Sequence, residues 1–418
     1  MSGCPYANLL DPDLYVDGKH HAIYADVRNR GGALVHIDDP LTGVPYWAVM
    51  KRDLADYICK NPLIFSSEAK TALPKEMNEE DIALQRLMMV NMDPPGHIKY
   101  RRIARNAFTP KAVQSYEESF RKTAKEIVDS VASQGRCEFV SEVAAELPLI
   151  AILELCGIPR EERKKFFDWT NAMFFTDDSD MSGEDGQAAA KMASMEIYMY
   201  AAKLAEEHKI KPLSNIVGAL LDGEVEDEKL TPEEFQLFFL MLIAAGNEST
   251  RSVTAHGMRL LIENPDQLQI LVDRPEVIPY AIEEMLRFNP AFVQMRRTVT
   301  EDIELEGQQL KAGDKVILNW HAMNHDPDLF ENPAKFDVLR FEKMPDLGNQ
   351  HRAFGVGEHY CIGAHLARLE LKAMFEEMIP RMRHPQFASP VEFVRDFFVN
   401  GIKAMPITFD PEKKASAA

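Results

Sequence analysis

Apolar residues recur at helical spacing over most of the chain. The segment 231–265 opens with Thr231 and Pro232, and a glutamate stands three residues after the threonine, which is the pattern of a capped helix N-terminus. The segment then continues for about eight turns with an apolar centre, so it predicts a long helix that crosses the interior. The segment 110–135 has similar spacing and ends at a glycine, and it is predicted as a second helix.

Short apolar or alternating runs, which are typical of strands, are fewer. They occur in YWAVM near residue 48, across 302–320, and in KAMPITF near the end. This balance predicts a mainly α fold with small antiparallel β-sheets. No linker rich in glycine or proline and no repeat of fixed period divides the chain, so we expect a single domain over 1–418. The polar stretch 176–187 is predicted as a surface loop.

The cysteines and the apolar runs indicate the cellular compartment of the protein. The five cysteines are dispersed, which argues against a disulfide framework and fits a reducing cytoplasm. The first residues contain no apolar core of a signal peptide, and the longest apolar run, FQLFFLMLIAAG, is too short to cross a bilayer. We therefore expect a cytoplasmic protein without a membrane anchor.

The charge is strongly negative but unevenly distributed. A net charge of −19 argues against nucleic acid as a general partner. The segment 94–116, however, has no acidic residue. Its basic residues are Lys99, Arg101, Arg102, Arg105 and Lys111. This basic segment predicts a local anionic ligand or partner, and a solvated helix face is the alternative.

The segment 353–363, AFGVGEHYCIG, surrounds Cys361 with three glycines. No second cysteine is close in sequence, and although His359 and His365 flank Cys361, a fourth metal ligand is not evident. A buried inert cysteine is another alternative. A haem-thiolate site explains more of the loop, because glycines let the main chain approach a flat macrocycle and adopt positive φ. The N–H groups that open the following helix would favour the anionic sulfur.

This loop resembles the haem-binding signature of the cytochrome P450 family. The matching positions are Phe354, Gly355, Gly357, His359, Cys361 and Gly363. The resemblance implies a cytochrome P450 fold in which Cys361 is the axial ligand of the iron of haem b. It extends from about residue 90 to the end, because further motifs of the family follow in the expected order.

Two of these motifs would support the loop and the haem propionates. Glu284 and Arg287 form the family's Glu-x-x-Arg motif, and Arg340 matches its second arginine. The resemblance implies a structural role in which one buried carboxylate lies between two guanidiniums. The positions that match the family's cofactor-binding residues are His97, Arg101, Arg297, His351 and His359. His351 is expected one layer further out, and Arg296 is an alternative to its neighbour Arg297.

The predicted long helix carries the sequence AGNEST at 245–250. It resembles the family's oxygen-activation motif, which implies that Ala245 and Gly246 leave room for dioxygen. Glu248 and Ser249 would relay protons to the oxygen being reduced. The family more often has threonine at the position of Ser249, and Thr250 offers the next hydroxyl. We expect the function to persist, with more oxygen lost as peroxide.

The resemblance implies a haem-thiolate monooxygenase that inserts one atom of O2 into a C–H bond and reduces the other to water. No dinucleotide-binding Gly-x-Gly-x-x-Gly follows a predicted strand, so the electrons are expected from outside the chain. The expected donor is an acidic ferredoxin with a separate ferredoxin reductase, docked on Arg102, Arg105 and Lys111.

The expected substrate is a hydrophobic small molecule. Segments that would line the pocket are rich in phenylalanine, methionine and leucine, and they resemble those of terpenoid and steroid side-chain hydroxylases. Alkyl-aromatic or fatty-acid hydroxylation is the alternative. A haem-binding sensor without turnover and a peroxide-driven enzyme are alternatives of other classes. The retained pair Glu248 and Ser249 argues against both.

Overall fold

The computed structural model of the protein describes residues 6–16, 18, 20–174, 178, 185–225 and 228–412. These residues are mainly helical, and the sheets are small, as the sequence predicts. Most of the predicted surface loop at 176–187 lies outside the described residues, and its last two residues, Gly186 and Gln187, already belong to α10.

The helices differ widely in length, and α12 is the longest of those described. Their bounds are α1 His20–Gly31, α2 Arg52–Lys60, α3 Glu79–Gln85, α4 Gly96–Arg105, α5 Pro110–Gln114, α6 Glu117–Ala132, α7 Glu146–Cys156, α8 Arg163–Phe174, α10 Gly186–Ile210, α11 Ile216–Asp222, α12 Pro232–Glu263, α13 Pro265–Asp273, α14 Ile278–Phe288, α15 Trp320–Asn324, α16 Arg340–Lys343, α17 Leu347–Gln350 and α18 Ala364–Arg381.

The strands form one five-stranded sheet, one three-stranded sheet and three pairs. Their bounds are β1 Leu34–Ile37, β2 Tyr46–Val49, β3 Phe65–Ser66, β4 Arg136–Glu138, β5 Glu224–Val225, β6 Glu228–Lys229, β7 Gln294–Val299, β8 Ile303–Leu305, β9 Gln308–Leu310, β10 Lys315–Asn319, β11 Arg383–Phe387, β12 Glu392–Phe393, β13 Ile402–Ala404 and β14 Pro406–Asp410. The predicted strands near residue 48 and across 302–320 are present.

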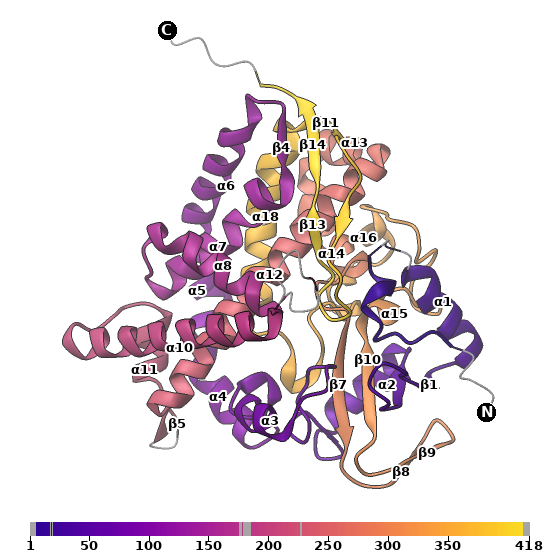
Figure 1. The fold of residues 1–418 in the computed structure, drawn as a ribbon. Helices are drawn as coiled ribbons and strands as arrows, with labels where there is room; N and C mark the ends of the chain where they lie inside the picture. The colour runs from indigo at the N-terminus through magenta and orange to yellow at the C-terminus, as the bar shows by residue number, and fades with distance from the viewer. Residues whose placement is uncertain are drawn as a thin grey trace.

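Helix α12 runs through the middle of the molecule (Figure 1). Its N-terminus has the predicted capping box, in which Thr231 and Glu234 each bond the other's backbone N–H. The helix packs against α7, α8, α10, α14 and α18, so most of its side chains are buried. The predicted interior helix is therefore confirmed, and it packs against the helix that follows Cys361.

The five-stranded sheet has the strand order β1-β2-β10-β7-β3 and lies with α1 and α15 away from the helices α6, α7 and α10 (Figure 1). All of its pairs are antiparallel except β2 and β10, which run parallel with Tyr46 opposite Lys315. The predicted small antiparallel sheets are thus present, with this one parallel pair among them. The two strands are too far apart in sequence for a local turn to set their direction.

The helix predicted over 110–135 is two helices, α5 and α6. The Ser115 hydroxyl donates to the carbonyl of Ala112 at 2.6 Å and ends α5. After Tyr116, α6 starts with Glu117 and Glu118, acidic residues that suit the positive end of a helix. Both helices contact α18, so the chain changes direction at the break while both of its parts stay packed against α18.

Four cysteines lie within the described residues, and all four are free thiols. Cys59, Cys137 and Cys156 are buried, whereas Cys361 is accessible. Among the described helices, none has both the length and the apolar character needed to cross a membrane.

Candidate functional site

The loop that carries Cys361 lies between α17 and α18 and folds back on itself. The Cys361 N–H donates to the carbonyl of Phe354 at 2.9 Å. Gly355 and Gly357 adopt φ of 69° and 75°, the left-handed region that favours glycine. Gly363 has φ of −85° and is the N-cap of α18, so positive φ was the wrong expectation for this glycine.

Gly357 is required by a close contact as well as by its φ. A Cβ atom placed on it would lie 3.0 Å from the backbone carbonyl oxygen of Cys59 in α2. A side chain here would push the loop off α2, because a backbone oxygen cannot rotate away. The glycine therefore brings the loop against the N-terminal part of the chain.

The Cys361 thiol lies at the N-terminus of α18, as predicted. Its side chain is accessible, although protein atoms surround it closely. Burial raises the pKa of the Cys361 thiol, and the Gly363 N–H, Arg101 and Arg368 oppose this rise. A positively charged ligand such as a ferric ion would complete the stabilisation of the thiolate.

Basic side chains from three separate segments meet next to this loop. Helix α4 supplies His97 and Arg101, β7 supplies Arg297, and the loop supplies His359. The rings of His97 and His359 lie 4.1 Å apart, centroid to centroid. An Arg101 guanidinium N–H donates to the carbonyl of Tyr360 at 2.5 Å, which ties α4 to the loop.

This basic group is electrostatically unbalanced. Burial, followed by Arg101 and Arg297, lowers the pKa of His97 to about 4. Burial, followed by Arg297, His97 and Arg101, lowers the pKa of His359 to about 2. The Nδ1 atom of His97 is buried without a hydrogen-bond partner among the described residues. Carboxylates such as haem propionates would supply both the missing charge and the missing partner.

The geometry favours Arg297 over Arg296 for this group. The two residues are adjacent in β7, so their side chains point to opposite faces of the sheet. A guanidinium N–H of Arg296 donates to Glu76 at 3.0 Å, and the pair is joined by Lys315. Arg297 instead acts on His97 and His359, on the side of the cysteine loop.

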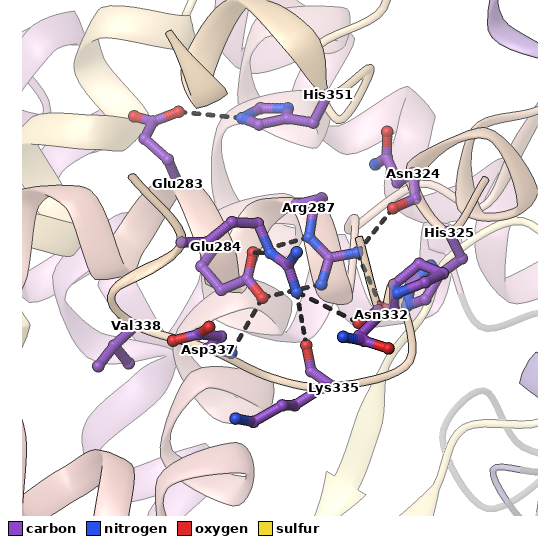
Figure 2. A network of polar contacts seen from close by, with 12 residues as sticks. Glu283, Glu284, Arg287, Asn324, His325, Asn332, Lys335, Asp337, Val338 and His351 are labelled. Atoms are coloured by element: carbon purple, nitrogen blue, oxygen red, sulfur yellow. Dashed lines mark hydrogen bonds and ion pairs between the residues drawn. The ribbon is translucent and has the colours of Figure 1, made fainter. Parts of the chain in front are cut away.

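The predicted ion cluster of Glu284, Arg287 and Arg340 is present and buried. Two N–H groups of Arg287 donate to the Glu284 carboxylate at 2.7 and 2.8 Å, and Arg340 Nε donates at 2.9 Å (Figure 2). The Asp337 backbone N–H donates to the same carboxylate at 3.1 Å. Arg287 also donates to the carbonyl of Asn324 at 2.7 Å. The cluster therefore fastens α14 to the chain that leads into the cysteine loop.

A second bridge beside this cluster was not predicted from the sequence. Glu283 accepts two N–H bonds from Arg368 of α18, at 2.6 and 2.9 Å. It also lies 3.0 Å from His351 Nε2 (Figure 2). The His351 Nδ1 atom accepts from the Ala353 N–H at 3.2 Å, so Nε2 carries the proton given to Glu283. His351 is thus one layer behind the loop, as expected, and it positions the loop from there.

Asn324 is a further residue that the sequence analysis did not include. Its side-chain oxygen accepts from the Arg352 N–H at 2.7 Å at the start of the loop. Isolated Glu, Arg and Asn residues are common, and neither Glu283 nor Asn324 belongs to a spaced motif of its own. The only available signal was that Glu283 precedes the Glu-x-x-Arg motif.

The AGNEST segment lies in the central part of α12. Ala245 is exposed although its helix is otherwise mostly buried, and Ser249 is half-buried. The Ser249 hydroxyl donates to the carbonyl of Ala245 at 2.9 Å. Thr250 is buried instead. Ala245 and Ser249 therefore present the accessible side of α12, whereas Thr250 does not.

Glu248 is fully buried and is paired on its own helix. Its carboxylate lies 2.5 Å from Arg251, whose guanidinium also donates to Asn171 of α8. Burial raises the pKa of Glu248, although Arg251 opposes the rise. Gly246 faces α7, where an added Cβ would lie 3.1 Å from Ile152. The glycine thus allows close helix packing, and its predicted role beside dioxygen stays a prediction.

A thiol at a helix N-terminus, a group of basic side chains beside it and an accessible turn of a central helix define a haem-thiolate site. Comparisons with known proteins agree. The sequence profile described as Cytochrome P450 matches residues 275–391. A "Steroid C26-monooxygenase" of Rhodococcus jostii is 35% identical over 410 residues, covering 96% of this chain and 84% of that protein.

A "Methyl-branched lipid omega-hydroxylase" of Mycobacterium tuberculosis is 34% identical over 93% of this chain and 92% of its own. A Mycobacterium marinum cytochrome P450 in complex with pseudoionone superposes with a TM-score of 0.86 and 30% identity, covering 98% of this chain and all of that one. A Bacillus megaterium cytochrome in complex with testosterone superposes with a TM-score of 0.79 and 28% identity. The superposition covers 93% of this chain and 99% of that one.

The chain belongs to the cytochrome P450 family. It is a monooxygenase that uses haem b and O2 and acts on a hydrophobic substrate. Bound haem with a thiolate ligand supplies the activation of O2 and the cleavage of its O–O bond.

Proposed function

We propose that this monooxygenase hydroxylates the branched hydrocarbon part of a steroid or of a methyl-branched lipid. The names of two relatives support this substrate class, because one is a steroid C26-monooxygenase and the other a methyl-branched lipid omega-hydroxylase. Both relatives are aligned over more than nine-tenths of this chain. The proposed substrate is mostly apolar and needs only a few polar anchors.

One apolar cluster carries the proposal. Phe174 at the end of α8, Phe292 after α14, and Phe398 near β13 pack around the buried Val394 and Val399. The rings of Phe292 and Phe398 lie 4.9 Å apart. The three phenylalanines come from separate parts of the chain, and all three are only half-buried. They supply an aromatic surface for a hydrocarbon.

The buried guanidinium at the junction of α12 and α8 favours a neutral hydrocarbon end over a carboxylate. The Arg251 guanidinium, which is buried at the junction of α12 and α8, is engaged by Glu248 and Asn171. Clamping a fatty-acid carboxylate there would require breaking a buried ion pair, which is costly. A branched methyl end requires only apolar contacts.

We assign the proton relay to Glu248 and Ser249. Burial raises the pKa of Glu248, which favours a carboxyl group that can hold a proton. Ser249 lies one residue further on the same turn, with its hydroxyl bonded to the Ala245 carbonyl. That hydroxyl can rotate to donate towards the accessible side of the helix, because serine lacks the methyl group that restricts threonine.

The test is a binding and product screen with the haem-loaded enzyme. A steroid with a branched side chain and a methyl-branched fatty acid are each compared with a matched compound, the steroid nucleus alone and the straight-chain acid. We expect the branched compounds to shift the haem Soret band at concentrations at least tenfold lower and to yield products hydroxylated on the branch. Equal affinity for the matched compounds, or oxidation of the steroid nucleus, would contradict the proposal.

We further propose that electrons arrive from an acidic ferredoxin on the cysteine side of the haem. Arg102, Arg105 and Lys111 are exposed on α4 and α5. Helix α5 contacts α18, and a surface hollow between them is lined by residues that include His365 and Lys372. Opposite charges on the two proteins would speed their encounter.

Charge reversal tests this docking surface. In the double variant Arg105→Glu and Lys111→Glu, we expect ferredoxin-supported turnover to slow at low salt and the difference from the parent to shrink as salt is added. Turnover driven by added peroxide needs no partner and should stay unchanged. Unaltered ferredoxin kinetics at low salt would place the docking surface elsewhere.

A further inference from the structure

Four histidines from two distant segments of the chain gather beside one another. His20 and His21 open α1, His321 lies in α15, and His325 follows it. One ring nitrogen each of His20, His21 and His321 lie within 4.8 Å of one another. The His21 and His321 ring centroids are 4.1 Å apart, and the His325 ring stacks on His321 at 4.4 Å.

The chemistry of His321 makes this cluster unusual. The residue is 1% exposed, and neither of its ring nitrogens has a hydrogen-bond partner among the described residues. A buried polar atom without a partner costs roughly 1–3 kcal/mol, so such atoms call for an explanation. Nε2 of His325 is also buried without a partner, while its Nδ1 is 3.0 Å from the His321 carbonyl oxygen.

The ligand chemistry of the cluster indicates the class of metal. The grouped side chains are all imidazoles. Imidazole nitrogens without carboxylates suit zinc and related transition metals better than magnesium or calcium.

We propose that His20, His21 and His321 form a binding site for a transition-metal ion of the zinc class. Tetrahedral zinc holds imidazole nitrogens at about 2.0–2.1 Å, so small ring rotations would bring the three atoms together. His21 is half-buried, which gives the ion a way in from the surface. The guanidiniums of Arg259 and Arg287 act on the cluster and weaken the attraction of a cation, so the site is not among the tightest.

The metal would join two parts of the fold. Arg28 of α1 already donates to the carbonyl of Ala322 in α15 at 2.9 Å. Helix α15 ends at Asn324, which bonds both Arg287 and the Arg352 N–H of the cysteine loop. A metal across His21 and His321 would thus tie the N-terminal helix to the structure that supports the loop. This site is independent of the substrate and of the proton relay.

The experiment uses the untagged, haem-loaded full chain, so that Cys361 is engaged and no affinity tag binds metal. The protein is stripped with a chelator, titrated with zinc by calorimetry and analysed for bound zinc after gel filtration. X-ray absorption at the zinc edge then identifies the ligands without interference from iron. The variants are His21→Ala, at a half-buried position that tolerates change, and His321→Asn. His384→Ala, which alters an exposed histidine, is the control.

We expect about one zinc per chain, with scattering from three imidazoles. At zinc one hundred times above the dissociation constant, the unfolding temperature should rise by about 3 °C. His21→Ala and His321→Asn should each weaken zinc binding at least tenfold, with the control unchanged. If His321→Asn does not fold, the zinc affinity of His21→Ala is the deciding measurement. Absence of zinc binding in the calorimetric titration, or retention of full affinity in His21→Ala, would overturn the proposal.

Discussion

Glu283→Gln tests how the cysteine loop is held. The carboxylate accepts two bonds from Arg368 and lies 3.0 Å from His351, which in turn accepts the Ala353 N–H. The substitution keeps the shape of the side chain and removes its charge. It therefore weakens the link between α14, α18 and the loop without opening a cavity.

The pKa of Glu283 sets the size of the effect. Burial would raise it, but His351 and Arg368 lower it from 4.5 to about 2. The side chain is 16% exposed, so solvent screening is limited. The difference between the two pKa values corresponds to about 3 kcal/mol of stability at pH 7. This stability is fully present above pH 4.5 and is lost as the pH falls through about 2, so roughly half remains at pH 3.

Urea unfolding of the haem-loaded proteins measures this difference. At pH 7 we expect Glu283→Gln to unfold at lower urea, with a free energy of unfolding lower by about 3 kcal/mol. The gap should narrow as the pH is lowered towards 3, because Glu283 becomes protonated in the unfolded parent while it stays ionised in the folded parent down to about pH 2. Burial lowers the pKa of His351 and Glu283 opposes this lowering, so the histidine is more readily neutral in the variant than in the parent.

Glu276→Gln is the matched control, because this exposed carboxylate pairs with an exposed Arg274. Its effect should stay within about 0.5 kcal/mol. A stability of Glu283→Gln equal to that of the parent at pH 7, or a gap that does not change with pH, would refute the role given to this bridge. The fraction of reduced, carbon monoxide-bound protein with the thiolate Soret band should fall together with stability.

Four further substitutions probe the site. Cys361→Ala should abolish the red-shifted Soret band of the reduced carbon monoxide complex, and its retention would exclude Cys361 as the ligand. Glu284→Gln removes the negative charge that neutralises two buried guanidiniums. It should lower the free energy of unfolding, measured by urea unfolding, by about 3–5 kcal/mol. Ser249→Ala should keep haem and substrate binding but release more peroxide per electron consumed; unchanged coupling would contradict the relay. Gly357→Ala should cost about 1–3 kcal/mol, with Gly96→Ala, at an open position of ordinary φ, as the milder control.

Sequence alone predicted the features that depend on neighbouring residues. The capping box at Thr231 and the apolar centre of the segment it starts indicated α12, because both signals act within a few turns. The spacing of the loop around Cys361 identified the family motif for the same reason. The helix over 110–135 was misread only at its break, where a single side-chain bond from Ser115 ends α5.

Contacts between distant segments could not be predicted in this way. The parallel pairing of β2 with β10, the Glu283 bridge to Arg368, and the meeting of His20 with His321 each join residues far apart in sequence. Motif matches named His97, Arg101, Arg297 and His359 one by one, yet only the fold shows that their charges converge.

The division has a physical reason. Helix capping, glycine φ and motif spacing arise from forces that act over one or two turns, so they can be read in the sequence itself. Burial and ion pairing depend on which distant surfaces pack together and exclude water. A Glu or His in the sequence gives no sign of whether it will be buried or paired in this way. The sequence by itself determined the central helix and the thiolate loop, while the tertiary structure decided which buried charges and imidazoles surround them, because only close packing removes the water that would otherwise solvate each one.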